Sequence, residues 1–164
     1  MIEIDECHRH LIEGIILSIK PKSVLELGYG TGKTTKSILY ALNYNGFGTL
    51  SVVENFRDWN GNKPDHFIPK RFKHIYLDES EYLTSSTDVY DVIIADGDHY
   101  NTHKFWEKLV NMLTSKGCLI VHDVCNKDFP NLNVFTQLPG ALVFNTSSRI
   151  DEKCERGLAI LFKS

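Results

Sequence analysis

Three glycines at alternate positions, Gly28, Gly30 and Gly32, follow an apolar segment that contains Glu26. Residues 24–34 therefore predict a buried strand, a glycine-rich turn and the start of a helix. Because glycine has no Cβ, one side of this turn presents bare backbone, and positive φ angles cost little free energy there. A nucleotide-like ligand could lie directly on this main chain, close to the carboxylate.

Two common glycine loops do not match this turn. The tail Gly32-Lys33-Thr34 resembles the end of a phosphate-binding P-loop, but that motif needs another glycine five residues before Gly32, where Leu27 stands. A leucine Cβ would obstruct a loop that must wrap around phosphates. The dinucleotide-binding fingerprint also fails, because the third glycine comes one residue too early.

A second acidic residue ends the next β-rich segment. Glu54 closes residues 49–54 and lies roughly 20 residues beyond the glycine turn, the separation expected for an acid that binds a ribose hydroxyl. An exposed glutamate at a strand end is the alternative, and the preceding glycine turn favours the ribose role.

The series Glu26-Leu27-Gly28-Tyr29-Gly30-Thr31-Gly32 resembles motif I of the class I S-adenosylmethionine-dependent methyltransferases. The resemblance implies that Glu26 faces the ammonium group of the cofactor and that Glu54 binds its ribose. The full set of cofactor-binding residues that it implies is Glu26, Gly28, Tyr29, Gly30, Gly32, Glu54, Asp78 and Asp96.

Polar residues follow three more predicted strands. These are Asp78-Glu79-Ser80, Asp96-Gly97-Asp98-His99-Tyr100 and His122-Asp123. Ligands of open α/β sheets bind at the carboxyl ends of the strands, so these acids and histidines are expected at the functional edge.

The segments 94–99 and 117–123 resemble a narrower subgroup, the small-molecule O-methyltransferases that include macrocin-type sugar methyltransferases and cephalosporin-hydroxylase-like proteins. In that subgroup, acids that end the fourth and fifth strands bind a divalent cation. The resemblance implies that Asp96 and Asp123 are ligands, with His122 where the subgroup has another acid. This histidine leaves the ion open between Mg²⁺ and another divalent cation.

Such a cation would lower the pKa of a substrate hydroxyl group. His99 is the candidate general base, because imidazole titrates near neutral pH, and Asp96 and His122 are the other candidate catalytic residues. Two alternatives stay open: Asp96 contacts the cofactor or caps the next helix, and His99 only orients a neighbour. His8 and His10 are two residues apart on the first predicted helix, which makes them a poor metal pair.

The elements that position these residues alternate between strand and helix. Strands are expected over residues 23–27, 49–54, 72–77, 90–95, 117–121, 141–144 and 158–162, and helices over the segment before Pro21 and over residues 31–44 and 101–113. This alternation predicts an α/β fold, a Rossmann-like doubly wound and mostly parallel seven-stranded sheet with helices on both faces. The family resemblance implies that the last strand is antiparallel. Residues 1–164 are expected to form a single domain with an N-terminal helix.

The composition is ordinary for a globular protein, with a formal net charge of −3. We therefore expect neither nucleic acid nor membrane as a partner. The N-terminus is acidic, unlike a signal peptide, and the four cysteines form no C-x-x-C pair, so we expect a cytoplasmic protein. A homo-oligomer is compatible with the short chain, since a second copy could close the site.

The leading hypothesis is an S-adenosylmethionine-dependent O-methyltransferase acting on a small molecule or sugar, with Mg²⁺ or another divalent cation. Its substrate loops would include residues 55–69 and 125–138. The alternatives are a binding module that holds the cofactor without transfer and, less favoured, a P-loop-like nucleotide hydrolase.

Overall fold

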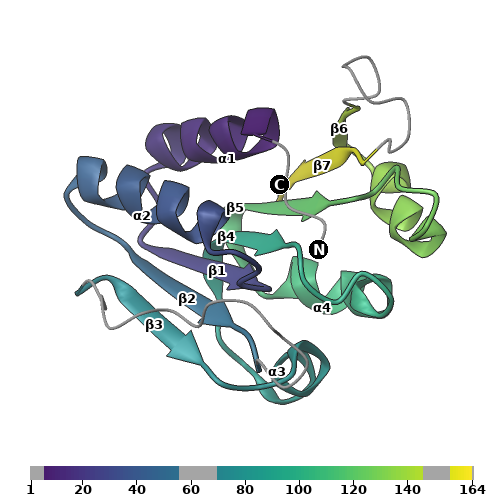
Figure 1. The fold of residues 1–164 in the computed structure, drawn as a ribbon, viewed down its shortest axis with the longest axis horizontal. Coiled ribbons are helices and arrows are strands. Elements are labelled where there is room, and N and C mark those ends of the chain that lie inside the picture. Colours follow the sequence, from purple (N-terminus) through teal and green to yellow (C-terminus); the bar gives the residue numbers. More distant parts are fainter. Residues whose placement is uncertain (1–5, 56–69, 146–155, 164) are drawn as a thin grey trace.

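A seven-stranded sheet forms the centre of the molecule in the computed structural model, which describes residues 6–55, 70–145 and 156–163 (Figure 1). The strands are β1 (Ser23–Leu27), β2 (Thr49–Val53), β3 (Phe72–Ile75), β4 (Tyr90–Ala95), β5 (Leu113–His122), β6 (Leu142–Phe144) and β7 (Leu158–Phe162). Their spatial order is β3-β2-β1-β4-β5-β7-β6, and β7 runs antiparallel to both of its neighbours. The predicted fold class is confirmed.

The register of the parallel strands brings their carboxyl ends to one edge. Leu27 pairs with both Val53 and Ala95, and Ala95 pairs with Val121. The residues that follow these positions therefore emerge side by side, as expected for an open α/β sheet. This alignment brings four features to the same edge of the sheet: the glycine turn, Glu54, Asp96 and His122.

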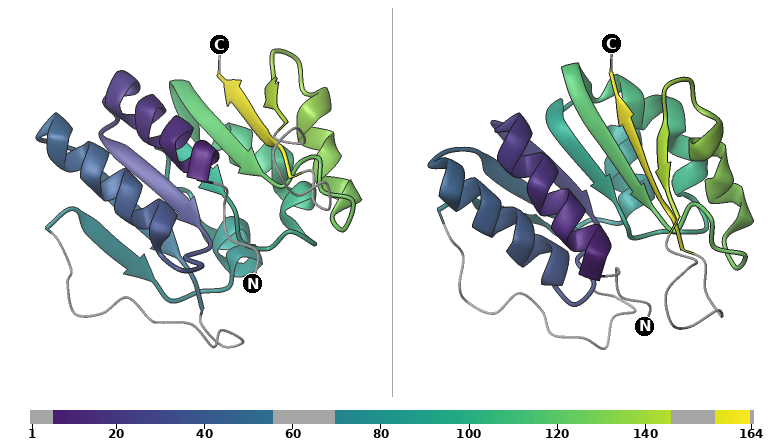
Figure 2. Two further views of the ribbon diagram at one scale, coloured as in Figure 1. Left: turned by 45° about the horizontal axis from the view of Figure 1, so that its top comes forward. Right: turned by 90° about the horizontal axis from the view of Figure 1, so that it is seen from above.

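Helices cover both faces of the sheet (Figures 1 and 2). One face carries α1 (Glu6–Ile19) and α2 (Lys33–Asn45), and the other carries α3 (Glu79–Ser85) and α4 (Trp106–Asn111). Successive strand residues point to opposite faces. Val24 accordingly packs in the core beneath α1 and α2, whereas Leu25 packs in the core on the α3 and α4 side.

The prediction of a single helix over residues 101–113 is wrong in part. The chain forms a 3₁₀ turn over Thr102–Phe105 and then the short α4, and Leu113 already belongs to β5. Leu113 pairs with Tyr90, so strand pairing overrides the helical periodicity there. The strand is therefore longer at its start than the expected 117–121.

Smaller differences lie at element ends. Helix α2 begins at Lys33 rather than at residue 31, because Gly30 and Gly32 adopt left-handed backbone angles that a helix cannot contain. Strands β2 and β3 end one and two residues before their predicted ends, at Val53 and Ile75. The substrate loop expected over residues 55–69 lies outside the described residues, except for Asn55. Among the described helices, none combines the length and apolar character needed to cross a membrane.

Candidate functional site

The glycine turn has left-handed backbone angles, and its Cβ side is open at Gly30 but packed on Gly97 at Gly28 and on Tyr29 at Gly32. Gly28, Gly30 and Gly32 have φ angles of 88°, 52° and 74°, which side-chain-bearing residues rarely adopt. The Gly28 N–H donates a 3.0 Å hydrogen bond to the Val53 carbonyl oxygen, which anchors the turn to β2. A Cβ on Gly32 would overlap the ring of Tyr29. The turn is therefore fixed at one end by β2 and packed closely at the other.

Glu26 lies beneath this turn and is almost fully buried, with 1% of its surface exposed. The Thr35 hydroxyl donates a 2.7 Å hydrogen bond to Glu26 Oε2. Burial raises the pKa of Glu26 to about 8, although the bond from Thr35 lowers it. Glu26 thus holds a proton at neutral pH until a cationic group comes close.

Two of the predicted cofactor-binding acids border one small pocket. Its volume is about 190 Å³, and its lining includes Glu54, Asp78 and Gly97. The Tyr29 N–H donates a 3.2 Å hydrogen bond to Glu54 Oε2, which ties Glu54 to the glycine turn. Asp78 caps α3 by accepting a 3.0 Å bond from the Ser80 N–H.

A larger groove of about 460 Å³ lies between β3 and α3 and contains none of the predicted site residues. Its lining includes Lys73, Tyr82 and Asp88. The polar residues that could perform chemistry converge outside this groove, at the carboxyl ends of the strands.

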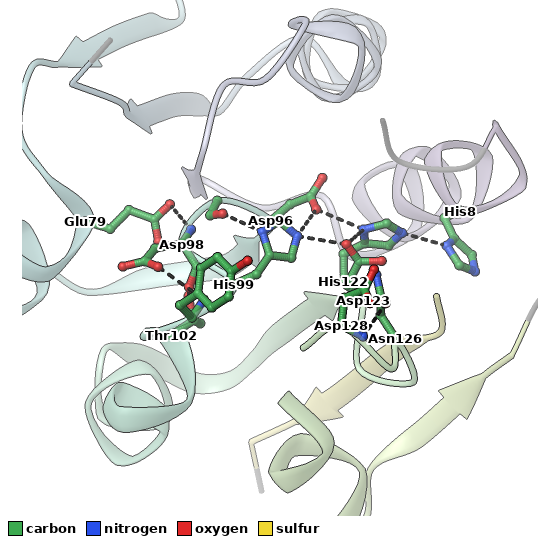
Figure 3. Close-up of polar contacts among 12 residues, drawn as sticks. His8, Glu79, Asp96, Asp98, His99, Thr102, His122, Asp123, Asn126 and Asp128 are labelled. Atoms are coloured by element: carbon green, nitrogen blue, oxygen red, sulfur yellow. Dashed lines mark hydrogen bonds and ion pairs between the residues drawn. The ribbon is translucent and has the colours of Figure 1, made fainter. Parts of the chain in front are cut away.

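Four potential metal ligands converge at the carboxyl ends of β4 and β5: Asp96, His99, His122 and Asp123 (Figure 3). One ligand atom from each lies within 4.8 Å of the other three. His99 Nε2 lies 2.9 Å from Asp123 Oδ2, and His122 Nδ1 lies 2.9 Å from Asp96 Oδ1. The structure therefore brings together all three residues predicted as metal ligands and adds His99 to them.

The outer nitrogen of each imidazole has its own partner. His99 Nδ1 lies 2.6 Å from the Gly97 carbonyl oxygen. His122 Nε2 lies 3.2 Å from Nδ1 of His8, a residue of α1 that is 2% exposed. These contacts fix both rings with their inner nitrogens directed at the carboxylates (Figure 3).

The charges within the cluster are strongly coupled. Burial alone would raise the pKa of Asp96, but His122 and His99 lower it to about 2. Burial alone would lower the pKa of His99, but Asp123 and Asp96 raise it to about 10. Without another cation, His99 therefore carries a proton at neutral pH. A protonated imidazole cannot act as a base, so the predicted base role requires this balance to change.

Sequence reasoning missed His8, and it missed the burial of Glu79, which it placed at the functional edge. His8 precedes Ile12 and Ile16 at helical spacing, so the buried stripe of α1 was a signal that its ring points inward. Glu79 is also buried, and its Oε1 accepts a 2.9 Å hydrogen bond from the Asp98 N–H. Burial raises the pKa of Glu79 to about 8. Asp98 in turn accepts a 2.8 Å bond from the Asn101 side chain and so holds the turn before the 3₁₀ segment.

Comparison with known proteins agrees with this geometry. A family model described as a methyltransferase domain matches residues 25–124, and the chain belongs to that family. This range runs from within β1 to just past Asp123, the acid that follows β5. No protein in the curated sequence set matches.

Solved structures with the same fold include several methyltransferases. The O-methyltransferase TomG from Streptomyces achromogenes, solved with SAM, aligns with a TM-score of 0.75 at 13% identity, over 99% of this chain and 82% of TomG. Cofactor-bound Rv0187 from MTB aligns with a TM-score of 0.74 at 16% identity, over 97% and 80% of the two chains. A putative caffeoyl-CoA O-methyltransferase from Staphylococcus aureus aligns with a TM-score of 0.70 at 18% identity, over 99% and 86%.

Proposed function

We propose that this protein transfers the methyl group of S-adenosylmethionine to an oxygen atom of a small molecule or sugar. In this reaction the bond between the sulfonium sulfur and the methyl carbon breaks, and a bond from the acceptor oxygen to that carbon forms. The hydroxyl proton leaves to a base, and S-adenosylhomocysteine is released. The observation that carries the proposal is the junction of two features at one sheet edge: the bare glycine turn and the Asp/His cluster.

The cofactor would occupy the edge formed by the turn and the small pocket. Glu54 and Asp78 line that pocket, so their carboxylates would accept hydrogen bonds from the ribose hydroxyls and the adenine edge. Gly30, where nothing lies within 4 Å of a Cβ, would let the ligand approach the backbone, with Tyr29 beside it, and Gly28 and Gly32 would keep the turn in the shape that this requires. Glu26 would bind the ammonium group of the cofactor, because the positive charge would favour the ionised form of the Glu26 carboxylate. Asp96 would lie between the cofactor and the cluster.

A divalent cation suits the chemistry of the residues after β4 and β5. Asp123 is 1% exposed; among the described groups its Oδ2 faces the two imidazoles of the cluster, and its Oδ1 has no hydrogen-bond partner. A buried carboxylate with one oxygen unpartnered is poorly compensated once the neighbouring imidazoles are neutral, so the residues fit a cation. Asp96, His122 and Asp123 would hold it. When bound, the ion supplies Lewis-acid activation of an acceptor hydroxyl.

The protein's own contribution is mainly positioning. The sheet register places the ends of β1, β4 and β5 together, which would align an acceptor oxygen with the methyl group. The segment after β5 contains a 3₁₀ helix over Pro130–Gln137 and follows Asp123 directly. Since Phe129 packs on His99 with ring centroids 4.6 Å apart, this segment would form one wall of the acceptor site.

The proposal is tested with S-adenosylmethionine carrying a labelled methyl group and a panel of hydroxylated small molecules and sugars. Label should appear in at least one acceptor, in an amount equal to the S-adenosylhomocysteine formed. Binding of the cofactor with no transfer across a broad panel would instead favour a binding module.

A further inference from the structure

We infer that Asp96, His99, His122 and Asp123 form a four-ligand site for a zinc-like transition-metal ion, with His8 as a positioning residue. The inference builds on the proposed function, because it names the class of ion that the same site would take. It also assigns His99 as a ligand of the ion, in place of the general-base role expected from the sequence.

Four of the six distances between the inner atoms lie near those expected around a tetrahedral ion. His99 Nε2 lies 2.9 Å from Asp123 Oδ2 and 3.6 Å from Asp96 Oδ1. His122 Nδ1 lies 2.9 Å from Asp96 Oδ1 and 3.7 Å from Asp123 Oδ2. Tetrahedral ligands at about 2.0–2.1 Å from Zn²⁺ are roughly 3.3 Å apart, which lies between these values.

The donor types favour the same class of ion. Two imidazole nitrogens and two carboxylate oxygens suit Zn²⁺, Co²⁺ or a similar borderline ion. Mg²⁺ prefers six oxygen ligands and usually keeps several waters, so two imidazoles suit it poorly. Four protein ligands fill a tetrahedral site, so an acceptor oxygen would have to enter as a fifth ligand, an expansion that catalytic zinc sites undergo.

The outer contacts have the pattern found around metal-binding histidines. The carbonyl oxygen of Gly97 can only accept, so His99 Nδ1 must donate to it at 2.6 Å. This leaves the lone pair of neutral His99 on Nε2, directed at two carboxylates. Metal-binding histidines commonly donate their other ring N–H in this way, which fixes the tautomer.

Asp123 supplies an independent observation. Its Oδ1 is buried without a hydrogen bond from any described group, and its φ angle is 60°, in the left-handed region that non-glycine residues rarely occupy. Such backbone strain persists where the surrounding structure requires one side-chain direction. Here that direction takes the carboxylate to His99 Nε2 (Figure 3).

His8 would act through His122 and not on the ion. The two rings meet edge to face with centroids 5.2 Å apart, and their facing nitrogens are 3.2 Å apart. His8 comes from α1, so this contact joins the N-terminal helix to the strand ends (Figure 3). Loss of such an outer partner typically weakens metal binding by about 10- to 100-fold.

The test uses Co²⁺, whose visible absorption is strong in a tetrahedral site and weak in an octahedral one. The full chain is stripped with a chelator and titrated with Co²⁺. We expect strong absorption at one ion per chain, which Zn²⁺ abolishes and excess Mg²⁺ leaves unchanged. His99→Ala and Asp123→Asn should each lose the strong absorption. A weak octahedral spectrum, no binding, or displacement by Mg²⁺ would overturn the inference.

His8 is tested by three variants in the same titration. His8→Leu should bind Co²⁺ about 10- to 100-fold more weakly. His8→Asn, which keeps a polar atom near the position of Nδ1, should restore most of the affinity. His10→Leu changes an exposed residue of the same helix and should bind like the wild type. Equal affinity in all three variants would remove the positioning role.

Binding of S-adenosylhomocysteine is measured in parallel by calorimetry. If it binds and Co²⁺ does not, the ion inference fails and the proposed function stands. If Co²⁺ binds and S-adenosylhomocysteine does not, the proposed cofactor site fails and the ion site stands.

Discussion

Gly28 and Gly97 bring two strand-end turns into direct backbone contact. A Cβ on Gly28 would lie 2.5 Å from the Gly97 Cα, and a Cβ on Gly97 would overlap Glu79 Oε1. The turn after β1, which would bind the cofactor, therefore rests on the turn after β4, which carries Asp96 and His99. This contact adds to the sheet register in positioning the two halves of the proposed site.

Gly97→Ala should separate the two turns. We expect a loss of about 1–3 kcal/mol in the free energy of unfolding, the range for overpacking, together with weaker binding of S-adenosylhomocysteine. Urea denaturation and calorimetry measure the two effects. Gly14→Ala is the matched control, because nothing lies within 4 Å of a Cβ there and the residue is inside α1. That variant should gain about 0.5–1 kcal/mol. Wild-type stability and affinity in Gly97→Ala would contradict the close-contact account.

Glu54→Gln should weaken cofactor binding. The carboxylate lines the small pocket, and hydrogen bonds to charged groups contribute about 1.5–3 kcal/mol, so the dissociation constant of S-adenosylhomocysteine should rise roughly 10- to 100-fold. Glu81→Gln alters an exposed glutamate of α3 and serves as the control. If both variants bind with equal affinity, Glu54 does not contact the ribose.

Glu26→Gln should reduce the pH dependence of stability. Between about pH 4.5 and 8, folded Glu26 keeps a proton that the unfolded chain has released, so stability falls as the pH rises through this window. Its share of the slope is about 1.4 kcal/mol per pH unit, and the variant should lose that share. Glu79, whose pKa is also raised to about 8, keeps its own share of the slope. Urea denaturation of the ligand-free protein at several pH values measures this.

Thr35→Val offers a second check on Glu26. The Thr35 hydroxyl lowers the pKa of Glu26, so its removal should extend the window of falling stability to higher pH. An unchanged slope in Glu26→Gln would show that Glu26 is already ionised in the folded protein.

Asp123→Asn should separate chemistry from cofactor binding. Asparagine tolerates a φ of 60°, so the backbone after β5 should be retained. We expect turnover in the methyl-transfer assay to fall by at least about 10²-fold, while S-adenosylhomocysteine affinity stays close to that of the wild type. A parallel loss of affinity would make Asp123 a cofactor contact and not part of the reacting centre.

Much of the sheet could be predicted from the sequence, because its central strands are short apolar runs bounded by glycine or charged residues. β1, β4 and β7 have the predicted bounds. The early start of β5 at Leu113 could not be predicted, because the helical periodicity of the preceding segment gives no sign that Leu113 pairs with Tyr90. Helix α3 was missed because seven residues with two acids show no clear apolar stripe.

The site was predictable where residues follow strands directly, as Asp96 and Asp123 do. Contacts between distant segments could not be predicted, because no local pattern links His8 to His122, which are 114 residues apart in the chain. Burial of Glu79 likewise depends on its contact with the turn at Gly97, which only the folded sheet creates.

Calorimetric titration of the purified chain with S-adenosylhomocysteine tests the central claim most directly. We predict one site per chain with a dissociation constant on the order of micromolar, about −8 kcal/mol, and no binding heat from ATP with magnesium. Silence toward both S-adenosylhomocysteine and S-adenosylmethionine, or saturable binding of ATP with magnesium instead, would contradict the account.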